Sequence, residues 1–180
     1  MSRPVLVLFL LCSACVSHQE YPDNWSSEIA NSSGCPDISG TYELVGHCSE
    51  QRNTDFPFKG HLLQTHFWAS GNLAPSFGLT IARIDDDRIQ VLAGHGEDLS
   101  ESQTLSLENR DFECEEGKLW ISRLTGVPPL SVISAKMGFV KAADGSLVGE
   151  DQAVGAGLFY IIPIPMASTD YCRWDAIKAD

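Results

Sequence analysis

Apolar positions in the sequence recur in short runs between acidic and glycine-containing turns, and no long helical period is present. Between residues 77 and 83 apolar and polar residues alternate, and the alternation resumes at Ile89 after three consecutive aspartates, Asp85, Asp86 and Asp87. Such alternation is typical of a strand with one buried face. The two runs therefore predict a β-hairpin whose turn carries the aspartates.

The same pattern predicts two further hairpins, one that turns at residues 115–117 and one that turns at residues 143–145. Additional strands are expected at residues 41–45, 62–68, 157–164 and 171–174. The all-apolar run 158–162 is typical of a strand that is covered on both faces. Pro163 and Pro165 should end this strand, because proline donates no ladder hydrogen bond.

The predicted fold class is all-β. Short strands in series favour one antiparallel meander over residues 35–180, closed into a small β-barrel, because closure removes the exposed edges of a sheet. A two-sheet β-sandwich is the alternative. The hydrophobic content of 43% agrees with a single domain that builds its own core.

The chain starts with the pattern of an export signal. Arg3 precedes an apolar run over residues 5–11, and two small residues follow. The tetrad from Cys12 to Cys15 resembles the lipobox of bacterial lipoproteins, although Cys12 stands where lipoboxes usually have leucine. The resemblance implies that residues 1–14 are a signal peptide and that Cys15 carries acyl chains. The alternative is an ordinary secreted protein that is cut in the same region.

Residues 15–34 are expected to form a flexible tether between the lipid and the domain. Ser, Asn, Glu, Pro and Asp dominate this segment, and Tyr21, Trp25 and Ile29 are its only bulky apolar residues. So little apolar surface does not offset the cost of ordering the backbone.

The charge balance restricts the possible partners. Twelve Lys and Arg stand against 24 Asp and Glu, and because Arg3 leaves with the signal, eleven against 24 give the mature chain a formal charge of −13. An acidic surface repels nucleic acid and anionic lipid head groups. It permits attraction to a basic protein.

Four cysteines remain after Cys15, namely Cys35, Cys48, Cys114 and Cys172. In an exported chain this even number predicts two disulfides. Four cysteines permit three connectivities, and the sequence leaves all three open. The most local choice joins Cys35 to Cys48 and Cys114 to Cys172.

No pattern in the sequence predicts catalysis, and no metal or other cofactor is expected. His61 and His66 would lie on opposite faces of the expected strand, so they could not share a metal ion there. The mature chain also lacks the closely spaced cysteine pair that is typical of zinc sites. Trp68, Trp120 and Trp174 all fall in expected strands, where they fill the core or, alternatively, line a ligand cavity.

Three segments, residues 35–42, 114–120 and 143–147, resemble segments of uncharacterised small proteobacterial lipoproteins. The resemblance implies a place in the bacterial envelope and carries no known activity. We therefore expect a non-catalytic binding domain, held by the lipid on Cys15 at the periplasmic face of the outer membrane, or else a secreted soluble protein. The residue after Cys15 is Val16, whereas an Asp at this position is associated with retention in the inner membrane of enteric bacteria. Val16 therefore favours the outer membrane. An inhibitor of a basic hydrolase such as lysozyme and a lipocalin-like carrier of a small apolar ligand are the alternative functions.

Overall fold

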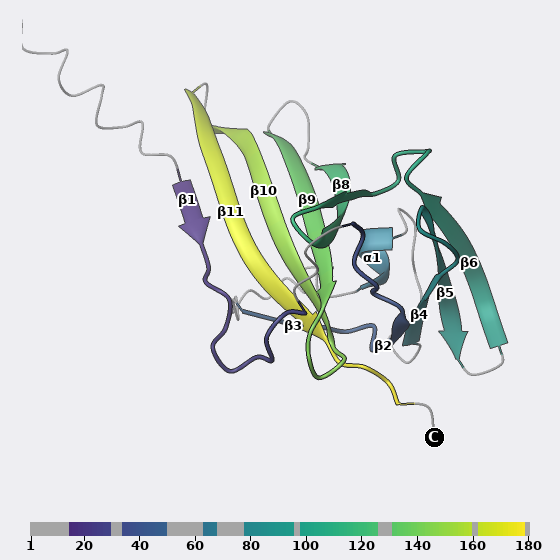
Figure 1. Cartoon of the computed structure of the whole chain (residues 1–180). Coiled ribbons are helices and arrows are strands. Elements are labelled where there is room, and N and C mark those ends of the chain that lie inside the picture. Colours follow the sequence, from purple (N-terminus) through teal and green to yellow (C-terminus); the bar gives the residue numbers. More distant parts are fainter. Residues whose placement is uncertain are drawn as a thin grey trace, which may run out of the picture.

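Two separate β-sheets share one hydrophobic core (Figure 1). The computed structural model describes residues 15–29, 34–49, 63–67, 78–95, 98–125, 131–159 and 162–178. The predicted all-β class is confirmed. Among the described strands no closed barrel is found, because β6 and β7 do not pair and residues 107–112 carry the chain from one sheet to the other. The arrangement matches the two-sheet alternative.

The larger, seven-stranded sheet contains an antiparallel meander in the order β7-β8-β9-β10-β11. These strands are β7 (Glu113–Glu115), β8 (Lys118–Thr125), β9 (Ser131–Lys141), β10 (Leu147–Phe159) and β11 (Ile162–Trp174). On its other side β11 pairs in parallel with β1 (Cys15–His18) and, nearer its end, antiparallel with β3 (His47–Cys48). The hairpins predicted to turn at 115–117 and 143–145 are confirmed as β7-β8 and β9-β10.

The smaller sheet has the strand order β2-β4-β5-β6. Its strands are β2 (Gly40–Tyr42), β4 (Gly78–Arg83), β5 (Arg88–His95) and β6 (Asp98–Ser106). The hairpin with the aspartate turn is confirmed as β4-β5. β6 is an addition to the expected strands, because Glu101 and Gln103 replace apolar residues between Leu99 and Leu105 and hide the alternation.

A short helix, α1 (Gln64–Phe67), lies between the two sheets (Figure 1). The strand predicted at 62–68 is therefore wrong. Leu63, His66 and Phe67 are buried and stand at helical spacing, so a single turn of helix points all three toward the core. With four residues α1 is short, and no helix in the described part of the chain has the length and apolarity needed to cross a membrane.

The strand predicted over 157–164 is also wrong, because this run contains the end of β10 and the start of β11. Pro163 and Pro165 lie inside β11, opposite Leu158 and Ala156. β1 pairs with β11 only from Met166 onward, so among the described strands this stretch of β11 has a neighbour on one side alone. Proline is tolerated at such an edge because no partner there needs its missing N–H.

Trp174 stands at the centre of the core and is fully buried. Two glycines leave room for its ring. A Cβ on Gly46 would lie 2.5 Å from Trp174 Nε1, and a Cβ on Gly149 would lie 2.9 Å from the edge of the same ring. Phe139 packs nearby, with ring centroids 6.0 Å apart. Side chains of both sheets and of α1 therefore fill the space between the layers.

Two disulfides link Cys35 to Cys114 and Cys48 to Cys172, across sequence separations of 79 and 124 residues. The prediction of two disulfides is confirmed, and the most local connectivity is wrong. The cause is the sheet register, because β3 and β11 place Cys48 directly opposite Cys172. Neighbours in space rather than in sequence therefore pair.

Candidate functional site

The N-terminal segment, residues 15–29, lies against the outer face of the larger sheet. Its first four residues pair with β11, and the N–H of Ile29 donates a 2.9 Å hydrogen bond to the last carbonyl of β9. Tyr21 and Trp25 pack on an apolar cluster of the outer face that includes Val148. The prediction of a flexible tether is therefore wrong for these residues, because two aromatic rings and the backbone pairing compensate for the polar composition.

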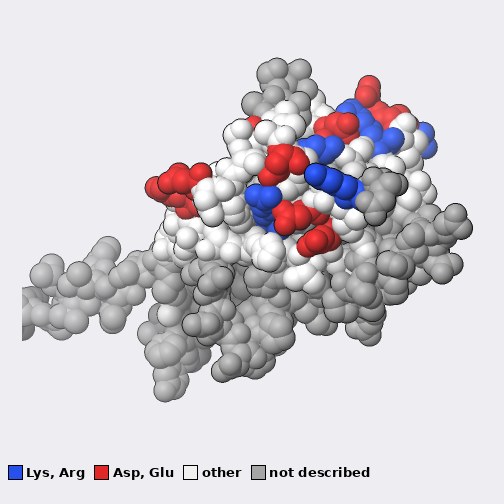
Figure 2. Space-filling view, turned by 90° about the horizontal axis from the view of Figure 1, so that it is seen from below, with Lys and Arg blue, Asp and Glu red and all other residues white. Residues whose placement is uncertain are grey.

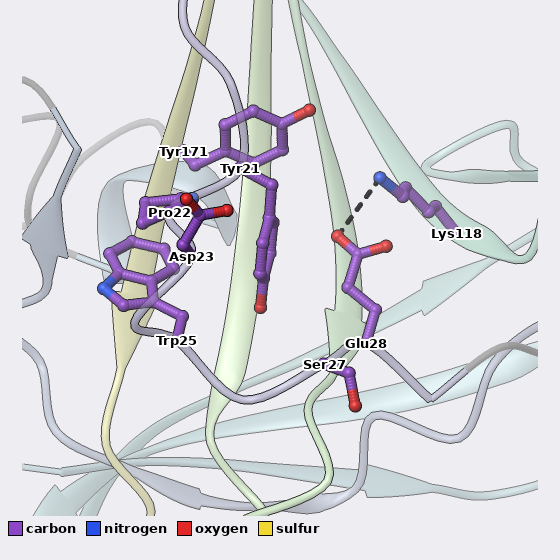
Figure 3. Close-up of a pocket in the computed structure, with 8 residues that line it drawn as sticks. All are labelled: Tyr21, Pro22, Asp23, Trp25, Ser27, Glu28, Lys118 and Tyr171. Atoms are coloured by element: carbon purple, nitrogen blue, oxygen red, sulfur yellow. Dashed lines mark ion pairs between the residues drawn. The ribbon is translucent and has the colours of Figure 1, made fainter.

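A hollow of about 460 Å³ lies between this segment and the sheet (Figure 3). Six of its lining residues come from the segment, one from β8 and one from β11. They are Tyr21, Pro22, Asp23, Trp25, Ser27, Glu28, Lys118 and Tyr171. None of the five disulfide or lipid cysteines predicted from the sequence is among them.

Three aromatic rings form one wall of the hollow (Figure 3). The ring of Tyr21 stands edge-to-face against Trp25 and Tyr171, with centroid distances of 5.9 and 5.5 Å. Burial raises the pKa of both tyrosines, and the charge of Glu28 raises the pKa of Tyr21 further. Both phenols therefore stay neutral and present their rings to the hollow.

The opposite wall is charged. Lys118 Nζ lies 2.5 Å from a carboxylate oxygen of Glu150 and 3.3 Å from one of Glu28, and Figure 3 shows the second pair. Burial works against the charged ammonium, but hydrogen bonds and charge from both glutamates outweigh it and raise the pKa of Lys118. Burial likewise works against the charged form of Glu150, and its bonds to Lys118 and Gln152 overcome this and lower its pKa.

Carboxylates outnumber cations around the hollow. Glu150 is the closer partner of Lys118, so one positive charge is matched before Glu28 and Asp23 are counted. Lys118 Nζ also stands 6.0 Å from the centroid of the Tyr171 ring. The remaining field in the hollow is therefore negative, next to aromatic faces that are themselves negative.

Asp144, in the turn between β9 and β10, binds the N-terminal segment through a hydrogen bond with Ser26. Its carboxylate accepts a 2.7 Å hydrogen bond from Ser26 Oγ and lies 3.0 Å from a guanidinium nitrogen of Arg173. Hydrogen bonds from the side chain and backbone of Ser146, with that from Ser26, outweigh partial burial and lower the pKa of Asp144 to about 2. The carboxylate is thus charged at neutral pH and holds one side of the hollow in place.

The two described tryptophans of the expected strands, Trp120 and Trp174, lie on different sides of the larger sheet. Trp174 lies in the core, whereas Trp120 lies on the outer face, where Lys136 Nζ stands 4.2 Å from the centroid of its ring. Trp68 lies outside the described residues. Within the described core, the space between the sheets is filled by side chains, which gives no support to a ligand cavity lined by these rings.

Of the two histidines considered from the sequence, only His66 is described. His66 is buried and packs edge-to-face on Phe139 and Trp174, while His61 lies outside the described residues. No group of three or more His, Cys, Asp or Glu side chains in the described ranges is arranged to hold a metal ion. His66 is therefore part of the core.

The comparisons with known proteins add no relative to this description. The lipid candidate, Cys15, opens β1 opposite Met166, and the sequence alone did not point to the hollow on the same sheet. Any functional conclusion therefore rests on these two features. No protein-family model, no curated protein and no solved structure matches the chain.

Proposed function

We propose that this chain is an exported, non-catalytic binding protein that is anchored in the bacterial envelope by acyl chains on Cys15 and binds a basic group of a partner protein. The hollow beneath the N-terminal segment is the binding site. The observation that carries this proposal is the combination of three aromatic rings with an excess of carboxylates in one hollow.

Cations are attracted to the faces of aromatic rings, and more strongly so where carboxylates stand nearby. Lys118 does not cancel this attraction, because Glu150 already neutralises it. The formal charge of −13 on the mature chain adds long-range attraction toward a basic partner. A Lys or Arg side chain of a basic hydrolase such as lysozyme has the charge and length to enter the hollow.

The proposed location is the periplasmic face of the outer membrane. The lipobox-like tetrad that ends at Cys15 supports lipidation, and Val16 supports the outer membrane. Two disulfides are typical of a protein that folds in an oxidising compartment. Lipidation is tested by the intact mass of the mature protein extracted from membranes. A mass that starts at Cys15 and includes acyl chains is expected, and an unmodified chain would refute the anchor.

Binding is tested by titrating the protein with lysozyme as the probe. Asp23→Asn removes a carboxylate from the hollow, and Asp87→Asn removes one from the exposed β4-β5 turn, so both variants change the net charge equally. We expect Asp23→Asn to weaken binding by roughly five-fold more than its control, which corresponds to about 1 kcal/mol. Affinity should also fall with added salt. Equal effects of the two variants, or no binding at low salt, would refute the hollow as the site for this probe.

A further inference from the structure

At one end of the larger sheet, the described parts of β8, β9, β10 and β11 carry no charged side chain. Residues 124–135 and 152–169 contain no Asp, Glu, Lys, Arg or His. In the sheet, the described parts of these segments, residues 124–125, 131–135, 152–159 and 162–169, form the adjoining ends of β8, β9, β10 and β11. In a chain with 24 acidic residues, four neighbouring strands thus share one uncharged end.

The outer face of this end is apolar and open to solvent. Val16 and Val154 are 67% and 63% exposed, the highest values among the exposed large hydrophobic residues of the described chain. Both stand opposite Ala167 in the ladders, so the three side chains lie side by side across β1, β11 and β10. Two residues further along, Ala156 and Pro165 pair with each other and are also exposed.

Cys15 lies at the same end. It precedes Val16 and opens β1, which runs down beside β11 from the upper end of the sheet in Figure 1. The opposite end is charged. There Arg173 forms ion pairs with Asp144 and Asp175, and Figure 2, which views the molecule from that end, shows acidic and basic side chains together. The larger sheet therefore has one uncharged end and one charged end along the direction of its strands.

We propose that the uncharged end of the larger sheet, with Val16, Val154, Ala156, Pro165 and Ala167 on its outer face, rests on the surface of the lipid bilayer as a second membrane contact beside the acyl chains. This inference rests on the proposed lipidation of Cys15. Acyl chains in the bilayer hold Cys15 at its surface, and β1 begins at that residue, so no linker separates the lipid from the sheet.

The charge distribution favours a bilayer as the occupant of this face. A chain of charge −13 is repelled by anionic head groups wherever its carboxylates approach them. The uncharged end is where that repulsion is smallest, and its exposed valines lose unfavourable contact with water at the interface. Docking in this way also directs the Arg173 end of the sheet away from the membrane.

The contact is tested with the mature lipidated protein reconstituted into vesicles of phosphatidylcholine that carries bromine on its acyl chains. Val154→Trp places a quenchable indole on the proposed contact. Val45→Trp is the matched control, because Val45 is 43% exposed and lies beside β3, which pairs with the far end of β11. Each variant is compared with the parent, which already carries four tryptophans.

We expect brominated lipid to remove roughly twice as much, or more, of the fluorescence added by Val154→Trp as of that added by Val45→Trp. Equal quenching of the two added tryptophans would overturn the proposal. A blue shift of the Val154→Trp spectrum that depends on protein concentration without lipid would also overturn it, because a second copy of the chain would then cover the face.

The mass of the mature protein tests the lipidation of Cys15 separately from the membrane contact. If the mature protein proves to be unacylated, the proposed lipidation is refuted by its mass alone. A hexahistidine tag in front of residue 15 then holds the same end on nickel-chelating lipid. Preferential quenching of Val154→Trp in that arrangement supports the contact, and its absence refutes it.

Discussion

Replacing Lys118 with methionine should destabilise the protein by about 2–3 kcal/mol. The substitution keeps most of the apolar stem of the side chain but removes the ammonium. That ammonium lies 2.5 Å from Glu150 and 3.3 Å from Glu28. Glu150 would then be left largely buried without its cation.

The expected magnitude follows from the exposure of the pair. Exposed ion pairs contribute less than about 1 kcal/mol, whereas removing one partner of a fully buried pair costs about 3–5 kcal/mol. The side chains of Lys118 and Glu150 are only 15% and 13% exposed, which places them close to the buried limit. Remaining contact with water, together with the hydrogen bond that Gln152 donates to Glu150, reduces the cost.

The effect should depend on pH. In the wild-type protein the pKa of Glu150 is lowered, so its contribution to stability is present above the unfolded value of about 4.5 and is lost as pH falls through the folded value. Without Lys118, burial raises that pKa, and the variant gains stability as pH falls. The two free energies of unfolding should therefore converge in acid.

Urea unfolding followed by tryptophan fluorescence measures these differences at pH 7 and pH 4. The Glu150→Gln and Lys118→Met/Glu150→Gln variants complete a double-mutant cycle, and the double variant should recover most of the lost stability. A loss below about 0.5 kcal/mol for Lys118→Met, or a double variant no more stable than the single one, would refute the treatment of this pair as buried.

Three further predictions concern other parts of the fold. Gly138→Ala should cost about 1–3 kcal/mol, because the new Cβ would lie 2.8 Å from the Trp120 ring, and an unchanged urea midpoint would show that the ring moves aside. Replacing Cys48 and Cys172 together by serine should cost about 2–5 kcal/mol in the same assay, since their bridge spans 124 residues. The pKa of Asp144 is lowered to about 2, chiefly by its hydrogen bond from Ser146, so the wild-type free energy of unfolding should fall between about pH 4 and pH 2. In Asp144→Asn the same fall should be smaller by about 1 kcal/mol, after allowance for solvent exposure.

The sequence predicted those parts of the fold that depend on neighbouring residues. Asp85 to Asp87 and Asp144-Gly145 lie in turns between alternating runs, so each hairpin was visible in a short window. The helix α1 was missed because one helical turn carries too few residues for a period to stand out. The β10-β11 hairpin was missed because its tip is as apolar as a buried strand.

The hollow could not be predicted from the sequence for a different reason. The segment that contains Tyr21, Trp25 and Glu28 is mainly polar, so its average composition predicts no packing of these side chains. They pack on a sheet whose strands come much later in the chain, where Lys118 and Tyr171 complete the site. The aromatic pair in an otherwise polar segment was the one local signal of this packing.

The connectivity of the disulfides sets an order of events for the making of the protein. Each bridge joins a cysteine from the first third of the chain to one that is synthesised much later. In a chain exported from its N-terminus, Cys35 and Cys48 reach the oxidising compartment together, while Cys172 is still to come. An oxidase that acts on thiols as they arrive would join these two early cysteines, and that bond must then be opened by thiol–disulfide exchange. If the chain is exported as proposed, efficient maturation would therefore depend on a disulfide isomerase, or on oxidation that waits until β11 has arrived.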